Sequence, residues 1–300
     1  NIHMRIATIY FEQTLYMRAL DEFQLVLAGR DYKDPHVLMA RIYETHGRLD
    51  KAVEEFEKLR KLEPKSLDIL LYTARLYSLM RKTQDAVVLL NEAVAMEPEN
   101  DQLQHSLALA YMAQDEDDKA IVTMRKALTL NPQKDSYYFE LGALMEKSGD
   151  YKGAIENMRQ AIELNPLHSN AHNFLGYMYA LEGYDLDQAL EHLKKALTIQ
   201  PRNGYFLDSL GWIYFKKGEP KKALTQIQKA LIYTEPDPVL YDHLGDILFS
   251  LENYDEASGA WRNSLFLTVN PKDDPGGEMP DPQTLKNKID KAKRLLQQSY

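Results

Sequence analysis

The sequence predicts an all-α solenoid of stacked helix pairs, because three series of residues recur with one period of about 34 residues. The first series consists of prolines, the second of alanines, and the third of alanines or glycines. Their members are Pro64, Pro98, Pro132, Pro166 and Pro201; Ala52, Ala86, Ala120, Ala154, Ala189, Ala223 and Ala257; and Ala7, Ala40, Ala74, Ala108, Gly142, Gly176, Gly211 and Gly245. Successive members are 33 to 35 residues apart in every series, which is the spacing of a repeated pair of helices.

Length and composition exclude several other classes of protein. The chain has 300 residues, of which 44% are hydrophobic and 27% charged, which is too apolar for a wholly disordered chain. No apolar run approaches the roughly 18 residues of a membrane span. The net charge of -9 disfavours a general nucleic-acid binder. Without cysteine, disulfide scaffolds, cysteine-ligated metals and thiol nucleophiles are excluded.

The period divides the chain into an array at 1–271, a loop at 272–281 and a C-terminal capping helix at 282–300. The array holds eight repeats, at about 1–32, 33–66, 67–100, 101–134, 135–168, 169–203, 204–237 and 238–271. Asp101 is expected to cap the first helix of the fourth repeat, and an extra residue in the sixth repeat is expected to enlarge the turn at 182–187. Leu285, Ile289 and Ala292 recur at helical spacing among polar residues, as a cap requires.

The N-terminal end shows no such cap, because a helical pattern begins at Asn1. We therefore expect a piece of a longer protein, or a partner at that end.

The motifs within each period are those of the tetratricopeptide repeat. Leu175-Gly176 leads to Tyr179, Ala52 is followed four residues later by Phe56, and Pro64 comes after the second helix. Small residues allow two helices to approach closely, and the aromatic residue fills the space on the same face. The chain resembles the tetratricopeptide family over nearly its whole length. The resemblance implies a right-handed superhelical solenoid whose first helices line a concave groove that binds protein or peptide partners.

No sequence motif indicates catalysis, a metal site or a cofactor. A phosphate-binding glycine loop, a nucleophile elbow and a zinc-protease helix are all missing from the sequence. His168 and His172 alone have ligand-like spacing, and a third ligand is not evident nearby. We therefore expect a non-enzymatic protein that binds other proteins, with no cofactor, no metal and no nucleic acid.

The predicted partner-binding groove follows from numbering each repeat so that the third series stands at position 8. Positions 4, 7, 8 and 11 then form the core face of the first helix, and positions 2, 5, 9 and 12 form a neighbouring stripe that repeat packing does not require. Arg41 and Arg75 share position 9 in adjacent repeats, where they could bind a carboxylate. The alternative is that each arginine pairs with an acid such as Asp34 or Asp68. His105 and Phe139 occupy the stripe in the more apolar middle of the array.

The late repeats place aromatic and hydrogen-bonding residues together on the stripe. These candidate groove residues are Asn173, Tyr177, Tyr205, Asp208, Trp212, Phe215, Asp242 and Asp246. Large aromatics beside polar groups are typical of peptide-binding surfaces. The alternative is that a tightly wound array packs these aromatics against its own inner face. The lysines and asparagines of a carboxylate clamp for chaperone tails do not stand at the required positions, so such tails are not expected as ligands.

The late repeats also resemble a narrower group of proteins. The motifs that carry the resemblance are Leu207-Asp-Ser-Leu-Gly-Trp212, His243-Leu-Gly-Asp246, and Ala257 with Trp261. This set is similar to the C-terminal repeats of Gram-negative outer-membrane tetratricopeptide lipoproteins of the LbcA type. The resemblance implies an adaptor for a C-terminal processing protease at the periplasmic face of the outer membrane. A cytoplasmic location, a substrate-recognition arm of a larger enzyme, and an assembly factor for pili or exported polysaccharide stay open as alternatives.

Overall fold

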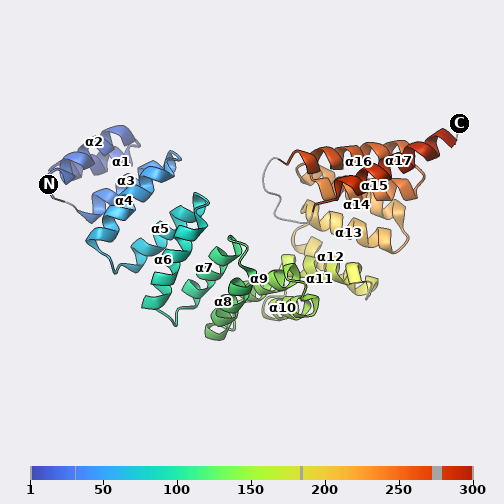
Figure 1. Cartoon of the computed structure of the whole chain (residues 1–300), viewed down its shortest axis with the longest axis horizontal. Coiled ribbons are helices and arrows are strands. Elements are labelled where there is room, and N and C mark those ends of the chain that lie inside the picture. Colours follow the sequence, from blue (N-terminus) through green and yellow to red (C-terminus); the bar gives the residue numbers. More distant parts are fainter. Residues whose placement is uncertain (1, 31, 183–184, 272–278, 299–300) are drawn as a thin grey trace. The chain divides into compact units, whose positions relative to one another are not determined.

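A computed structural model describes residues 2–30, 32–182, 185–271 and 279–298, and these residues form seventeen helices with no strand among them (Figure 1). The helices are α1 (Ile2–Glu12), α2 (Tyr16–Leu27), α3 (Lys33–Thr45), α4 (Leu49–Leu62), α5 (Leu67–Leu79), α6 (Thr83–Met96), α7 (Asp101–Met112), α8 (Asp117–Leu130), α9 (Asp135–Lys147), α10 (Tyr151–Leu164), α11 (Ser169–Glu182), α12 (Leu186–Ile199), α13 (Gly204–Lys216), α14 (Pro220–Tyr233), α15 (Pro238–Ser250), α16 (Tyr254–Val269) and α17 (Pro282–Gln298). Eight helix pairs followed by one C-terminal helix confirm the predicted all-α repeat solenoid.

The chain forms two compact units, residues 1–149 and residues 150–300. In each unit the first helix of a repeat packs against its second helix, and the second helix packs against the next first helix, as α3, α4 and α5 do. The boundary between the units falls after Gly149, between the two helices of the fifth repeat.

Small residues at the helix crossings form the core of each repeat. All seven alanines of the second series are fully buried, and so is Ala40 of the third series. The aromatic residue four positions after the second-series alanine is buried beside it, as Phe56 and Trp261 show with exposed fractions of 4% and 2%. The periodic residues therefore do what their spacing predicts, because they set the distance between the two helices of a repeat.

Two glycines of the third series lie directly against a side chain of the second helix. A Cβ atom added to Gly245 would lie 2.3 Å from Nε1 of Trp261, and one added to Gly176 would lie 1.8 Å from a methyl carbon of Leu193. At these two crossings the missing Cβ makes room for the side chain opposite, and the backbone conformation does not require glycine.

The C-terminal helix α17 covers the last repeat. Leu285, Ile289 and Ala292 are buried in one cluster with Leu248 and Trp261, so α17 lies along α16 (Figure 1). Most of the loop expected at 272–281 and part of the enlarged turn expected at 182–187 lie outside the described residues. The expected cap at Asp101 is wrong, because Asn100 accepts the amide hydrogens of Gln102 and Leu103 instead. Asp101 accepts hydrogen bonds from Asn131 and Tyr137.

Two repeats carry a polar pair at the same two places, position 4 and, counted without the extra residue of the sixth repeat, position 23. His36, Glu55 and His172 are buried, and His192 is partly buried. His36 Nδ1 lies 2.5 Å from Glu55 Oε2, and His172 Nδ1 lies 2.9 Å from His192 Nδ1. His172 therefore pairs with His192 across the repeat. In the third repeat the same positions hold Leu70 and Leu89, both buried in one apolar cluster. The fold thus accepts either a polar or an apolar pair at these two positions.

Replacing Gly245 by alanine is predicted to lower the free energy of unfolding by about 2 kcal/mol, because the new methyl group would displace the Trp261 indole. Urea unfolding followed by Trp fluorescence measures this change. Gly259 is the matched control, since nothing lies within 4 Å of its added Cβ. Gly259→Ala should raise stability by up to about 1 kcal/mol through helix propensity. Equal effects of the two variants would contradict the close-approach explanation.

The histidine pair predicts that stability falls as the pH falls from about 6.5 to about 4. Burial, together with the charge of His172, lowers the pKa of His192 to about 4, and burial also lowers the pKa of His172. The unfolded chain therefore takes up protons in this window before the folded chain does, at a cost of about 2–3 kcal/mol. Urea unfolding at pH 7.5 and pH 5 measures the loss of stability.

The control for this pH effect is His172→Leu/His192→Leu, which copies the apolar pair of the third repeat. This variant should lose less stability over the same pH range than the unmodified chain. Identical pH profiles for the two proteins would show that the pair does not titrate as described.

Candidate partner-binding site

The predicted stripe lies on one face of each first helix, and three of its polar members, Arg75, His105 and Asp208, contact the first helix of an adjacent repeat. Positions 2, 5, 9 and 12 are three, four and three residues apart, so they align along the helix. In the described residues the stripe runs along α3, α5, α7 and α9 in the first unit, and along α11, α13 and α15 in the second. The candidate residues of the two units are therefore described separately.

Arg75 of the first unit is held by an acid that the sequence analysis did not name. Its Nη2 atom donates to both carboxylate oxygens of Glu44, at 2.8 and 2.9 Å. The Tyr72 hydroxyl donates to the same carboxylate at 2.5 Å, and the Arg75 guanidinium lies 4.4 Å from the centre of the Tyr72 ring. Burial alone would raise the pKa of Glu44, but hydrogen bonds from Tyr72 and Arg75 and the charge of Arg41 outweigh it and lower the pKa.

Arg41 is exposed on α3 and makes no ion pair within the described residues. Both arginines therefore act on Glu44, Arg75 by direct contact and Arg41 through its charge. The alternative of internal pairing holds for Arg75, with Glu44 in place of Asp34 or Asp68.

A hollow of about 480 Å³ lies beside Arg75 on the first unit. Its lining is mainly apolar, with Leu71 from α5 and Leu109 and Ala110 from α7. Small residues at Ser106 and Ala110 leave this space open. The hollow can accept an apolar side chain next to the Arg75 guanidinium.

His105 forms a tie between the first helices α7 and α9. Its Nε2 atom lies 2.5 Å from Glu140 Oε2, and its ring stacks on Tyr137 with 4.4 Å between the centroids. Phe139 lies half-buried on α9. His105 thus links two repeats, and its polar nitrogen is already used within the chain.

Trp212 of the second unit lies flat against a histidine that the sequence analysis missed as a site residue. The indole and the His243 ring are stacked, with 4.1 Å between the centroids and 18° between the planes. His243 Nδ1 lies 2.9 Å from Asp208 Oδ1, and Phe215 contacts the indole at 5.2 Å between ring centroids. Burial would lower the pKa of His243, but Asp208, Asp242 and Asp246 outweigh it and raise that pKa. The structure therefore favours an imidazolium stacked on the indole.

Asp242 and Asp246 of α15 both form ion pairs with Lys288 of α17. Lys288 Nζ lies 2.7 Å from Asp242 Oδ1 and 2.7 Å from Asp246 Oδ1. Trp261 Nε1 also donates to Asp246 at 3.1 Å. Burial would lower the pKa of Lys288, but the two carboxylates outweigh it and raise that pKa. These aspartates fasten the terminal helix to the last repeat.

Three further candidates present groups toward the stripe of the second unit. Tyr205 on α13 is 62% exposed. The Oδ1 atom of Asn173 on α11 is buried and has no hydrogen-bond partner among the described residues. Tyr177 lies half-buried one turn further along the same helix.

The partners that the sequence analysis missed follow a spacing rule that could have found them. His105 and Glu140 are 35 residues apart, and so are Asp208 and His243. Each pair joins position 5 of one repeat to position 6 of the next. A search for complementary side chains at 35 residues would have identified both pairs. Lys288 lies outside the period and carries no such signal.

Two wider features of the described residues bear on function. No three His, Asp or Glu side chains among them are placed to share a metal ion. Within the same part of the chain, no helix combines the length and the apolar character needed to cross a bilayer.

Comparison with known proteins identifies the repeat class. A family profile described as the tetratricopeptide repeat protein 21 C-terminal ARM domain matches residues 28–183. The TPR repeat-containing protein MJ1428 of Methanocaldococcus jannaschii is 39% identical over 80 residues, which is 27% of this chain and 14% of that protein. The BBSome complex member BBS4 of Bos taurus is 38% identical over 79 residues, which is 25% of this chain and 14% of that protein. The chain thus matches only a small part of either relative.

A solved structure extends the likeness to most of the chain. The crystal structure of a tetratricopeptide repeat protein from Parabacteroides merdae covers 87% of this chain and 98% of its own, with a TM-score of 0.67 and 17% identity. At that identity the likeness concerns the fold alone. Since the family profile spans more than half of the sequence, this chain belongs to the tetratricopeptide repeat proteins.

Proposed function

We propose that this tetratricopeptide scaffold binds an extended or helical segment of a partner protein along the stripe of α11, α13 and α15. Scaffolds of this architecture present the first helices of successive repeats as one continuous surface. The role is binding without catalysis. The partner segment would contact the aromatic residues of α13.

One observation carries this proposal, the line of aromatic side chains along α13. Tyr205, Trp212 and Phe215 lie on one helix face, with Trp212 two turns after Tyr205 and Phe215 one turn after Trp212, and Tyr205 is 62% exposed. Exposed aromatic residues beside ordered polar groups supply contact area at little entropic cost. Stacking on His243 fixes the orientation of the Trp212 ring before any partner arrives.

The charged members of the stripe are less suited than the aromatic residues to contribute to the affinity for a partner. Asp208 is paired with His243, and Asp242 and Asp246 are paired with Lys288. A partner cation would have to displace an internal partner at each of these carboxylates. Recognition in the second unit is therefore assigned mainly to aromatic contacts, above all to the exposed Tyr205.

A narrower form of the proposal concerns the identity of the partner. The motif set around Trp212, His243 and Trp261 supports an adaptor for a C-terminal processing protease at the periplasmic face of a bacterial outer membrane. This form rests on sequence resemblance alone. Co-purification of such a protease with the chain from envelope fractions would support it, and recovery from soluble cytoplasmic fractions only would oppose it.

Tyr205→Ala is predicted to weaken partner capture about tenfold or more, because an exposed aromatic contact at a binding centre contributes on the order of 2 kcal/mol. The chain serves as bait for envelope and soluble fractions of the source cell, and captured proteins are quantified by mass spectrometry. Helicity and thermal stability should stay unchanged, since the side chain is 62% exposed.

Tyr151→Ala is the matched control, because Tyr151 is an exposed tyrosine of the same unit that lies on a second helix, α10. It should retain the partner that Tyr205→Ala loses. Equal retention by both variants would move the site away from the stripe of the second unit. Loss of fold in Trp212→Ala to the extent seen in Trp261→Ala would assign Trp212 to structure.

A further inference from the structure

A cleft of about 690 Å³ opens in the first unit between the second helices α2 and α4, with α3 at its floor. Leu27, Met39 and Leu62 contribute apolar walls. The α4 side of the cleft carries a row of charged residues at one-turn spacing, namely Lys51, Glu54, Glu55, Lys58 and Lys61. None of the stripe residues described above lines this cleft, so its chemistry is separate from the proposed function.

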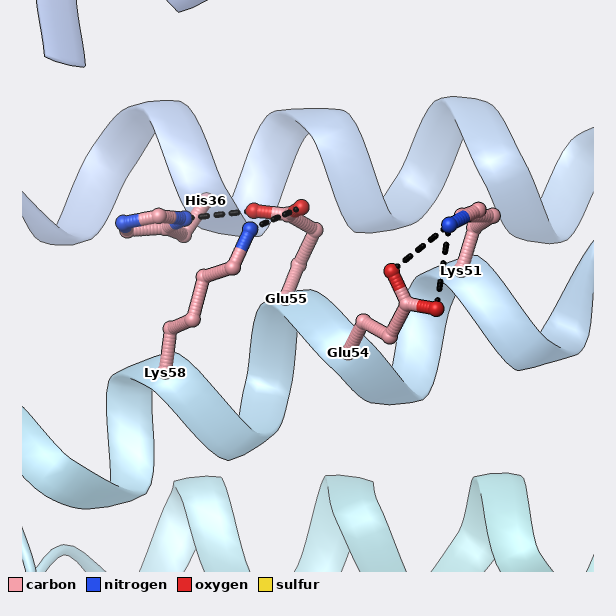
Figure 2. A network of polar contacts seen from close by, with 5 residues as sticks. All are labelled: His36, Lys51, Glu54, Glu55 and Lys58. Atoms are coloured by element: carbon pink, nitrogen blue, oxygen red, sulfur yellow. Dashed lines mark hydrogen bonds and ion pairs between the residues drawn. The ribbon is translucent and has the colours of Figure 1, made fainter. Parts of the chain in front are cut away.

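The floor of the cleft is a buried pair of polar side chains, His36 and Glu55, that holds a lysine in place (Figure 2). His36 and Glu55 are 1% and 3% exposed, and His36 Nδ1 lies 2.5 Å from Glu55 Oε2. The other oxygen of Glu55 accepts a hydrogen bond from Lys58 Nζ at 2.8 Å. Burial would raise the pKa of Glu55, but the contacts with His36 and Lys58 outweigh it and lower the pKa. Glu55 is thus a fixed anion that orients the Lys58 ammonium.

The rim adds two more cations. Lys51 Nζ donates to both oxygens of Glu54, at 3.0 and 2.8 Å (Figure 2). Lys61 is exposed and makes no ion pair within the described residues. An ammonium group has three donors, and Lys58 gives one of them to Glu55. Lys61 is therefore the cation with no internal partner within the described residues, while Lys58 and Lys51 offer a partner only the donors that they do not give to Glu55 and Glu54.

The packing of the repeat does not require this basic row. In the next repeat the positions of Lys51, Lys58 and Lys61 hold Asp85, Glu92 and Ala95. The fourth repeat keeps lysines, Lys119 and Lys126, at the places of Lys51 and Lys58, so the solenoid tolerates either charge at these positions. The lysines are seven and three residues apart, which corresponds to about 10 Å and 4.5 Å along a helix axis.

We propose that this cleft is a second docking site, which binds an acidic helical segment of a partner protein. Carboxylates of that segment contact Lys51, Lys58 and Lys61, and an apolar side chain between them packs on Leu27, Met39 and Leu62. Charge complementarity selects the partner, since ammonium groups with donors available match carboxylates at the same spacing. The site lies on the second helices, so one chain can hold two partners, one at the stripe and one at the cleft.

A synthetic helical peptide tests the proposal, with glutamates at the spacing of the three lysines and leucines between them. The peptide is labelled with fluorescein and titrated with the whole chain, and anisotropy reports binding. We expect saturable binding that weakens about tenfold in Lys61→Glu, because a repulsive charge replaces an attractive one. Lys61 makes no ion pair among the described residues, so the fold should be unchanged.

Two controls separate the cleft from other causes of binding. Lys126→Glu reverses an exposed lysine at the place of Lys58 in the fourth repeat, and it should leave the affinity unchanged. Tyr205→Ala, which tests the stripe, should also leave it unchanged. If neither control changes the affinity for the peptide and Lys61→Glu lowers it, the cleft binds the peptide. This conclusion does not depend on whether the stripe binds a partner.

Three results would overturn the proposal. Binding that does not saturate, or an equal loss in Lys126→Glu, shows that net charge alone attracts the peptide. Equal affinity for a peptide with lysine in place of every glutamate removes the charge complementarity. Phosphatidylserine vesicles that bind the chain and are released by Lys61→Glu, with no peptide binding, assign the lysines to a membrane surface.

Discussion

The close contact between the two helices of each repeat is the constraint on which the rest of the structure depends. Fully buried alanine, or glycine where the second helix presents Leu193 or Trp261, brings the helix axes together once per period. This contact fixes which face of the first helix turns toward the second. The remaining face has no partner within its own repeat, so its side chains meet the neighbouring repeat or solvent. The stripe is therefore a consequence of the core and not an independent feature.

The stripe performs two tasks that compete for the same side chains. Arg75 with Glu44, His105 with Glu140, and Asp208 with His243 all tie one first helix to the next. A charge used in such a tie is oriented, and it is also less available to a partner. Trp212 is also used within the chain, since its ring stacks on His243 and the ring centre lies 4.9 Å from Lys216 Nζ. Exposed Tyr205 has no such conflict, and for this reason the aromatic line is the better candidate for affinity.

The sequence was sufficient to predict the repeat architecture, because close helix crossings need small residues and these residues recur at a fixed period. It was not sufficient for the internal partners of the stripe. Position 6 faces the preceding repeat, so its role depends on how successive repeats pack, which no single period reveals. Lys288 lies beyond the array, and its contact with Asp242 and Asp246 required the placement of α17. At Asp101 the residue type was suitable for a cap, but Asn100 reaches the amides of the first turn. The repeat spacing does not tell which of two adjacent polar residues caps the helix.

Buried polar pairs show how a repeat protein can acquire local chemistry without changing its fold. Positions 4 and 23 hold Leu70 and Leu89 in one repeat, His172 and His192 in another, and His36 and Glu55 in a third. The apolar pair needs no hydrogen-bond partner from its surroundings. Glu55 is a buried carboxylate, and such a group is costly unless its oxygens are satisfied. His36 satisfies one oxygen and Lys58 the other, so burial of Glu55 draws a lysine to the edge of the α2–α4 cleft. A surface lysine thereby satisfies a buried acid in the core of one repeat, and the helix crossing that defines the fold is unaffected.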